Sequence, residues 1–472
     1  MMSESGAHIL VFPYPAQGHM IPLLDLTHQL AARGLNITIL ITPKNLPLLN
    51  PLLSTHPTSI TPVVLSFPPH PSIPAGVENT VDLPPSGFRT MMSALSELHN
   101  PIIDWFHNHS SPPSAIISDM FVGWTHRLAC QLGIRRYAFF PSGAFAISFI
   151  NSLWREMPQR RNPDDDNEML RLSKNPNSPV YPWWQLSPIF RSYVEGDPVS
   201  EFIRDLMLCN EASHGLVFNT FDGLEGVHLD YLAKDLGRDR VWSIGPLLPP
   251  DRVGPIERGG SSSVSPSEIS SWLDKCPDHS VVYVCFGSQA VLTNHQMEEL
   301  TLGLEKSGAK FILSVKGATK GHNNGGDYGF IPLGFEDRVA GRGLLIKGWA
   351  PQVLILQHRA VSAFLTHCGW NSILESIVAG VPMLAWPMGA DQYLNATLLV
   401  DQLDVAVKLC EGDKTVLDSD DLVQFVVEAT SEKWNERRAR AVGLSKAAVD
   451  AISEGGTSFN NMGDFARHLS KK

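Results

Sequence analysis

The chain has 472 residues, of which 43% are apolar. This length exceeds what a single hydrophobic core usually serves, so two globular domains are expected. The formal net charge of −11 argues against a nucleic-acid partner and against an anionic membrane surface, because both favour a surplus of lysine and arginine.

The N-terminus and the cysteines indicate the compartment. The first residues, MMSESGAH, hold no basic run, and Pro13 and Pro15 interrupt the apolar stretch that follows, so no signal peptide is expected. No segment reaches the roughly 18 unbroken apolar residues of a membrane span. The six cysteines lack CxxC spacing and are expected as reduced thiols. We therefore expect a cytoplasmic protein without integral membrane association. A monomer is also expected.

In the first half of the chain, short apolar runs alternate with stretches of helical period, which is typical of a parallel sheet covered by helices. A turn of small residues, PAQG, follows the first run, and Gly34 ends the helix after it. Strands are expected at 9–14, 37–41, 115–118 and 137–140, with a helix from about 19 to 33.

The second half repeats this arrangement and also opens with a strand, a small-residue turn (Gly287-Ser288) and a helix. Residues 246–271 have linker composition, with little apolar content. Two such lobes on a linker imply a cleft, with ligands beyond the carboxyl ends of the strands. Strands are expected at 281–286, 310–315, 344–347, 362–365 and 383–385, and helices near 295–306, 371–379 and 391–401. The fold class is α/β, with domains 1–245 and 276–455, a linker 246–275 and a final segment 456–472.

The stretch 349–392, WAPQVLILQHRAVSAFLTHCGWNSILESIVAGVPMLAWPMGADQ, carries the parts of a nucleotide-sugar site. Trp349 follows a predicted strand and precedes Pro351, where an exposed indole could stack on a uracil face. Considered alone, Trp349 could equally be a core tryptophan.

His367, Asn371 and Ser372 lie where a predicted strand gives way to a helix. Free backbone N–H groups and the positive end of the helix dipole meet at such a point, and a diphosphate fits there. The three side chains can add donors. An ordinary N-cap by Asn371 or Ser372 is the alternative that local sequence offers.

Acidic residues extend this site along the chain. Glu375 follows Ser372 by three residues, on the same side of the helix, where a carboxylate can accept both hydroxyls of a ribose. As a lone residue it would also suit a capping box. Asp391 and Gln392, at the next strand-to-helix turn, suit the hydroxyls of a sugar or, alone, simply a helix start.

This stretch resembles, nearly position for position, the signature box of plant secondary-product (family 1) UDP-glycosyltransferases, and HILVFPYPAQGHMIPLLDL is similar to their acceptor-side opening. The resemblance runs from about residue 7 to 469. It implies a GT-B fold of two Rossmann-like doubly wound domains facing each other across a cleft, and a last helix near 458–469 that packs back on the first. The implied UDP-sugar-binding residues are Ser288, Trp349, Ala350, Gln352, His367, Trp370, Asn371, Ser372, Glu375, Trp386, Asp391 and Gln392.

His19 is the candidate general base. Transfer of a glycosyl group to a phenol or alcohol requires the acceptor to lose its proton, and an imidazole suits that role near neutral pH. Asp119 ends a predicted strand of the same sheet and could orient the imidazole. An N-cap for a helix beginning near Val122 is its alternative. The resemblance implies that His19 and Asp119 form the catalytic pair, that the anomeric centre inverts, and that neither a metal nor another cofactor is needed.

A metal-dependent mechanism is the first competing hypothesis. Asp164, Asp165 and Asp166 superficially match the DxD signature of metal-dependent glycosyltransferases. No apolar strand precedes them, so a solvated loop is favoured. His107 and His109 have no cysteine or carboxylate at ligand spacing, so no metal site is expected.

The second competing hypothesis is a non-catalytic nucleotide-sugar or small-phenol binding protein on the same fold. It would keep Trp349 and Glu375 yet tolerate the loss of His19 or Asp119, and both are present.

Finer features indicate the substrates. Gln392 closes the box, and the family tends to have glutamine there for glucose donors, so UDP-glucose is the expected donor. Residues 66–88 and 191–205 resemble those of flavonol 3-O- and hydroxybenzoate glucosyltransferases, which implies a small phenolic acceptor such as a flavonol, another flavonoid or a hydroxybenzoate. The expected acceptor-binding residues are His19, Phe121 and Ser142, with Trp183, Trp184 and Phe190 as further lining.

Overall fold

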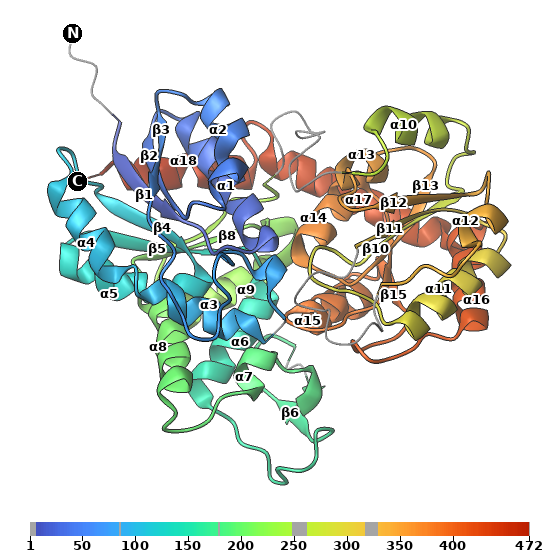
Figure 1. Cartoon of the computed structure of the whole chain (residues 1–472), viewed down its shortest axis with the longest axis horizontal. Helices are drawn as coiled ribbons and strands as arrows, with labels where there is room; N and C mark the ends of the chain where they lie inside the picture. The colour runs from blue at the N-terminus through green and yellow to red at the C-terminus, as the bar shows by residue number, and fades with distance from the viewer. Residues whose placement is uncertain (1–5, 85, 178–179, 248–261, 317–328, 472) are drawn as a thin grey trace. The chain divides into compact units, whose positions relative to one another are not determined.

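The computed structural model describes residues 6–84, 86–177, 180–247, 262–316 and 329–471 (Figure 1). The chain divides into two compact units: Met1–Leu247 with Ala451–Lys472, and Leu248–Asp450. The first unit therefore takes its residues from both ends of the chain. Among the described residues, no helix combines the length and apolar content that crossing a membrane requires.

The first unit is built on a seven-stranded parallel sheet in the order β3-β2-β1-β4-β5-β8-β9. From β1 the chain moves outward through β2 and β3, then returns to place β4 on the other side of β1. In doubly wound sheets, ligands bind beyond the carboxyl ends of the strands at such a reversal. The strands are β1 (His8–Phe12), β2 (Asn36–Ile41), β3 (Ile60–Val64), β4 (Ala115–Asp119), β5 (Arg135–Phe140), β8 (Gly215–Phe218) and β9 (Val241–Ser243).

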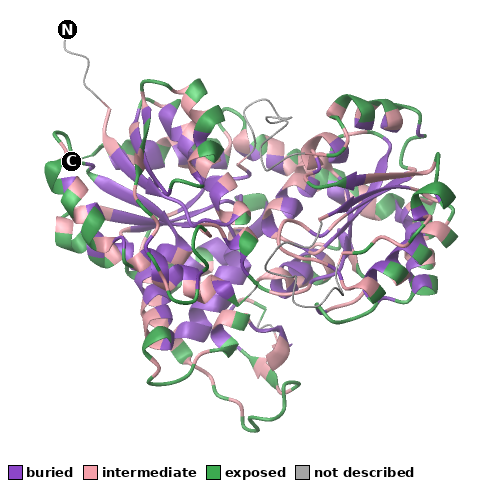
Figure 2. Ribbon diagram, viewed as in Figure 1, coloured by how far each residue is buried: buried purple, intermediate pink, exposed green. Residues whose placement is uncertain are grey.

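The core of this unit joins residues from both ends of the chain, because strand residues such as Ile9 and Ile117 share one apolar cluster with Phe465 and Leu469 of the last helix. Figure 2 shows the strands of each sheet largely in the colour of buried residues. The helices of the unit are α1 (Gln17–Ala31), α2 (Asn50–Thr55), α3 (Gly87–Ser96), α4 (His99–Asn108), α5 (Thr125–Leu132), α6 (Ala144–Glu156), α7 (Pro188–Arg191), α8 (Pro198–Ala212), α9 (Asp222–Asp235) and α18 (Thr457–Ser470), and a hairpin pairs β6 (Met169–Arg171) with β7 (Val180–Pro182).

The second unit has a six-stranded parallel sheet in the order β12-β11-β10-β13-β14-β15. Its strand order reverses between β10 and β13, as that of the first sheet does between β1 and β4. The strands are β10 (Val281–Cys285), β11 (Lys310–Val315), β12 (Gly343–Lys347), β13 (Val361–Thr366), β14 (Met383–Ala385) and β15 (Ala406–Lys408); the helices are α10 (Pro266–Asp274), α11 (Asn294–Lys306), α12 (Phe335–Arg338), α13 (Gln352–Leu356), α14 (Trp370–Ala379), α15 (Gln392–Thr397), α16 (Ser419–Ala429) and α17 (Asn435–Ile452).

Part of the expected linker is helical. Residues 248–261 lie outside the described residues, but Pro266–Asp274 form α10. Ser265 and Glu268 make a reciprocal capping box at its start, which satisfies two backbone N–H groups that would otherwise lack partners. The serine-rich composition concealed this helix start. Similarly, the helix expected at 391–401 ends at Thr397 and continues as a π-helix over Leu398–Gln402.

Candidate active site

His19 and Asp119 meet at the strand-order reversal of the first unit. His19 lies in the first turn of α1, and Asp119 is the last residue of β4. The imidazole Nδ1 lies 2.8 Å from Asp119 Oδ2, with the aspartate side chain fully buried and 18% of the histidine side chain exposed. A carboxylate only accepts, so the proton of a neutral imidazole sits on Nδ1 and the lone pair on Nε2. The pair therefore has the arrangement of an oriented general base.

Asp119 also caps the turn that follows it. Its Oδ1 accepts the backbone N–H of Phe121 at 2.8 Å, at the start of the 3₁₀ turn Met120–Val122. The two roles considered from sequence, orienting a histidine and capping a turn, thus use different oxygens of the same carboxylate. Because both oxygens are engaged, the carboxylate has little freedom to rotate.

Aromatic rings fix the plane of the His19 imidazole. Phe121 stacks on it with ring centroids 4.6 Å apart and 28° between the planes. Tyr14 contacts Phe121 edge-on at 5.2 Å, and its hydroxyl donates to the carbonyl of Phe88 at 3.0 Å. Burial raises the pKa of Tyr14 well above its usual range, so this phenol keeps its proton and remains a donor.

A buried arginine holds the end of β4 from behind. Arg136 donates from Nε to Ser118 Oγ at 2.9 Å and from its terminal nitrogens to Asn210 Oδ1 at 2.9 Å and the Asp119 carbonyl at 3.2 Å. Burial lowers its pKa to about 9. Sequence analysis missed this residue. The signal that could have found it is a charged side chain inside the apolar run of β5.

The other expected acceptor residues lie in two places. Ser142 is buried just beyond the carboxyl end of β5, the strand next to β4. Trp183 and Phe190 belong to a separate aromatic group: their rings are 5.9 Å apart, and Phe190 packs edge-on against Trp154 at 5.2 Å. The backbone N–H of Trp184 donates to the Asp166 carbonyl at 3.0 Å.

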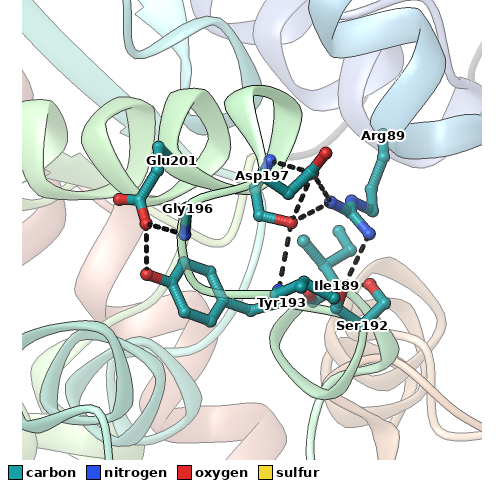
Figure 3. Close-up of polar contacts among 9 residues, drawn as sticks. Arg89, Ile189, Ser192, Tyr193, Gly196, Asp197 and Glu201 are labelled. Atoms are coloured by element: carbon teal, nitrogen blue, oxygen red, sulfur yellow. Dashed lines mark hydrogen bonds and ion pairs between the residues drawn. The ribbon is translucent and has the colours of Figure 1, made fainter.

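A polar cluster ties the segment between α7 and α8 to α3 (Figure 3). Arg89 of α3 donates to the carbonyl of Ser192 and to Ser200 Oγ, each at 2.8 Å. The Tyr193 hydroxyl donates to Glu201 Oε1 at 2.6 Å and so connects the loop to the first turn of α8. Residues 191–205, whose resemblance implied a phenolic acceptor, are thus held by hydrogen bonds to charged groups, which are stronger than neutral ones.

One peptide bond, between Phe88 and Arg89, connects this cluster to the aromatic residues around His19. Phe88, which precedes Arg89, stacks on Tyr14 with ring centroids 5.8 Å apart. A shift of α3 would therefore move both the loop and these aromatic residues.

In the second unit, three of the expected donor residues form one hydrogen-bonded group. Gln352 begins α13, and its Nε2 donates to Ser372 Oγ at 3.0 Å and to Glu375 Oε2 at 2.8 Å. The N-cap of α14 is Gly369, without a side-chain cap. Capping by Asn371 or Ser372, and a capping box with Glu375, are therefore not what these residues do.

His367 follows β13, and its ring lies against the backbone of two glycines. A Cβ on either Gly287 or Gly369 would lie 2.5 Å from a ring atom of His367. Burial lowers the pKa of His367 to about 4, so the imidazole is neutral at pH 7. Among the described residues, none is a hydrogen-bond partner of its buried Nδ1 atom. Ser288 follows Gly287, and its carbonyl accepts from Lys316 Nζ.

The expected tryptophans differ in their surroundings. Trp349, after β12, is partly exposed, and the Ala350 carbonyl beside it accepts the backbone N–H of Gln352 at 2.8 Å. Trp370 is buried at the start of α14. Trp386 is fully buried, packs edge-on against Phe286 at 5.4 Å and donates from Nε1 to the Gly412 carbonyl at 3.3 Å. The Trp386 side chain thus belongs to the core of the unit.

Asp391 and Gln392 lie at the start of α15. Gln392 Oε1 accepts the backbone N–H groups of Met388 at 2.9 Å and of Gly389 at 3.0 Å. This side chain is therefore folded onto its own turn, and its position is fixed before any ligand binds.

The residues considered for metal binding lie elsewhere. Asp164–Asp166 form an exposed loop, where Asp166 pairs with Arg160 at 2.7 Å and Asp165 accepts the backbone N–H of Asn167. His107 is exposed at the end of α4, and His109 packs against Trp105. Within the part of the chain that the structure describes, no three His, Cys, Asp or Glu side chains are grouped as a metal site would require.

Comparison with known proteins identifies the class. Residues 246–442 match the family described as UDP-glucoronosyl and UDP-glucosyl transferase. UDP-glycosyltransferase 89B2 of Stevia rebaudiana is 56% identical over 99% of this chain and 98% of its own length. Flavonol 3-O-glucosyltransferase UGT89B1 of Arabidopsis thaliana is 54% identical, over 98% and 96%.

Solved structures agree. The crystal structure of Arabidopsis thaliana UGT89C1 complexed with UDP-L-rhamnose has a TM-score of 0.82 and 38% identity, covering 99% of this chain and all of that one. A complex of the same protein with quercetin has a TM-score of 0.79. The chain belongs to the plant family 1 UDP-glycosyltransferases and is a glycosyltransferase of the GT-B fold that uses a UDP-sugar. The expected family, fold class and enzyme class are confirmed.

Proposed function

We propose that this enzyme transfers glucose from UDP-glucose to a hydroxyl of a small phenolic acceptor, a flavonol, another flavonoid or a hydroxybenzoate, with inversion and without a metal. The single observation that carries the proposal is the 2.8 Å contact between His19 Nδ1 and Asp119 Oδ2. It leaves Nε2 as a base beyond the carboxyl ends of the strands, where ligands of this fold bind. A protein that only bound nucleotide-sugars would have no need of an oriented base.

The chemistry assigned to this pair is a single displacement. His19 Nε2 takes the acceptor proton as the acceptor oxygen forms its bond to C1 of the sugar, and the bond from C1 to the phosphate oxygen breaks. UDP leaves with the electron pair, and attack from the opposite face inverts C1. Asp119 stabilises the imidazolium and is not itself protonated. Phe121 and Ser142 are assigned to the acceptor, with Trp183, Trp184 and Phe190 as more distant lining.

The diphosphate is assigned to the start of α14. The helix has no side-chain cap, so its first N–H groups and its dipole are available to an anion. The neutral His367, with no partner for Nδ1 among the described residues, can donate one N–H there. Ser372, Asn371, Ser288 and the neighbouring Trp370 complete this part of the site.

The remaining donor residues are assigned along the box. Trp349 and Ala350 would meet the uracil, and Glu375 with Gln352 the ribose, because a carboxylate can accept two hydroxyls. Asp391 and Gln392 would meet the hexose. Trp386 is assigned a supporting role only, since its indole N–H is taken by Gly412.

The donor sugar is tested by a panel. UDP-glucose, UDP-galactose, UDP-xylose and UDP-rhamnose are each supplied with a flavonol and a hydroxybenzoate, UDP release is measured, and NMR gives the position and anomeric configuration of the product. UDP-glucose is expected to give the highest kcat/KM. Gln392→His should shift the ratio of glucose to galactose transfer while leaving the affinity for free UDP nearly unchanged.

The alternative, a non-catalytic binding protein, predicts that UDP binds but that none of the sugar donors in this panel is converted to UDP.

The absence of a metal requirement is tested with EDTA. Turnover in excess EDTA is expected to equal turnover in its absence. If EDTA stopped the reaction and Mn²⁺ or Mg²⁺ restored it, the metal-free proposal would be wrong. A monomeric state and a cytoplasmic location are proposed on the sequence features alone.

A further inference from the structure

A buried tyrosine lies behind the Gln352–Glu375 pair. Tyr283 is in the middle of β10, and its hydroxyl donates to Gln352 Oε1 at 3.3 Å. Its ring is fully buried and stacked on Phe364, with centroids 4.8 Å apart and 18° between the planes. The ring is therefore held by packing, and the hydroxyl is a separate element that could be removed without emptying the core.

The polarity of these contacts determines how the Gln352 amide is turned. Its NH₂ group faces Glu375 Oε2 and Ser372 Oγ, and its oxygen faces the Tyr283 hydroxyl. Turning the amide over would set its oxygen against the Glu375 carboxylate, so that two acceptors faced each other, and this end therefore decides the orientation. The Tyr283 hydroxyl, which also interacts with the side chains of Cys285 and Ser314, supports that orientation by donating to the amide oxygen. Burial raises the pKa of Tyr283 well above its usual range, and the phenol therefore remains a donor.

We infer that Tyr283 is a positioning residue for the donor substrate: its hydroxyl helps to hold the Gln352 amide, which in turn fixes the Glu375 carboxylate for the ribose hydroxyls. The inference rests on the proposed contact between Glu375 and ribose and extends it to a fully buried residue behind that contact. A carboxylate already held by the amide loses less freedom when the nucleotide binds, and a pre-organised group binds more tightly.

The test is Tyr283→Phe, measured with UDP and 2′-deoxy-UDP by calorimetry and with UDP-glucose in steady state. One hydrogen bond of this kind corresponds to about a two- to tenfold effect. We expect the affinity for UDP to fall by that factor, the preference for UDP over 2′-deoxy-UDP to shrink, the KM for UDP-glucose to rise and kcat to stay within about twofold. A purely structural role would lower thermal stability and leave this preference unchanged.

The route through Gln352 is tested by a double-mutant cycle. In a Gln352→Ala background, Tyr283→Phe is expected to change neither UDP affinity nor the preference for the ribose hydroxyl. The matched control is Tyr137→Phe, which removes a buried hydroxyl that has no partner among the described residues and should alter neither quantity. An equal loss with and without Gln352 would overturn the inference.

Glu375→Ala separates this inference from the proposed function. If that variant keeps the full preference for UDP over 2′-deoxy-UDP, the ribose contact is wrong and the inference falls with it. If Glu375→Ala loses the preference but Tyr283→Phe retains both preference and affinity, only the role of Tyr283 is overturned.

Discussion

The two units carry their candidate functional residues at corresponding points of the same topology. In the first, His19 follows β1 and Asp119 ends β4; in the second, Gly287 and His367 follow β10 and β13. Both pairs of strands flank the point where the strand order reverses. The units differ in the turn that follows the first strand of each sheet.

The length of the first turn decides the difference. In the first unit α1 begins at Gln17, five residues after β1 ends at Phe12, so a helix delivers the His19 side chain. In the second unit α11 begins only at Asn294, and the turn after β10 contains Gly287 with φ +73° against the His367 ring. Topology locates a site, whereas the length of one turn and the size of its residues decide whether the turn presents a side chain of its own or makes room for a side chain from the neighbouring strand, as Gly287 does for His367.

The largest expected effect lies in the first unit alone. His19→Ala should lower kcat for glycosyl transfer by at least about 100-fold, since general-base catalysis contributes that much or more. Asp119→Asn should lower it less, because the base remains. Affinity for UDP, measured by calorimetry, should stay within about twofold in both variants. Retention of more than about a tenth of kcat in His19→Ala would show that the base lies elsewhere.

The complementary change lies in the second unit. Gly287→Ala places a Cβ 2.5 Å from the His367 ring, and overpacking of this kind costs about 1–3 kcal/mol. We expect UDP affinity to fall about tenfold. Gly308→Ala is the matched control, because Gly308 also has a positive φ (+66°) but open space around it. Similar UDP affinities in the two variants would mean that the Gly287–His367 contact is unimportant for the donor.

A smaller effect is expected on the stability of the first unit, without a matching effect on UDP affinity. Arg89→Ala removes two charged hydrogen bonds (Figure 3) and should lower the unfolding free energy by about 1–2 kcal/mol. Arg127→Ala breaks the exposed pair with Asp205 and should cost less than about 1 kcal/mol. Thermal or urea unfolding measures both. UDP affinity that fell in Arg89→Ala as much as in Gly287→Ala would contradict the separation of roles.

The smallest effect concerns acid. His214 and His468 lie with Nε2 atoms 3.2 Å apart where α18 packs on the first unit. Burial, followed by the charges of Arg240 and His468, lowers the pKa of His214 to about 4; burial and Arg135 lower the pKa of His468. Because these pKa values are lower in the folded protein, their contribution to stability is complete above pH 6.5 and is lost as pH falls towards about 4.

Thermal unfolding between pH 7 and 4 measures this loss. In His468→Gln the decline in melting temperature should be shallower. If the melting temperature fell equally steeply with pH in the variant and the parent, the histidine pair would not be the source of the loss in stability.

Sequence reasoning recovered elements whose period was strong and whose residues were central. The strands expected at 310–315 and 383–385 match β11 and β14 residue for residue. The strands that were missed are short or at an edge: β3 is an edge strand containing Pro62, β8 is an interior strand of only four residues, and β6, β7, β9 and β15 have three residues each. Proline is tolerated there because an edge strand leaves N–H groups unpaired.

The site divides in the same way. The sequence could group the residues of the box into one candidate donor site because they are nearly contiguous, and their assignment to the donor stays a prediction. Arg136 and Tyr283 were missed, since their partners are distant in sequence and each resembles an ordinary strand residue. The sequence alone also could not distinguish a core tryptophan from a ligand-facing one, and Trp349 and Trp386 prove to have different surroundings.

The discontinuity of the first unit has a consequence for synthesis. Its last helix, α18, supplies core residues such as Phe465 and Leu469 and receives a hydrogen bond at Asp464 from Trp242. A ribosome adding about 5–20 residues per second needs roughly 10–40 s to travel from Leu247 to Ala451. During that interval the part of the first unit's core against which α18 packs is exposed, whereas the second unit can complete its core from its own residues. A premature stop that deletes only the last turns would leave the emerged polypeptide a client for chaperones, although every residue of both sheets had been translated.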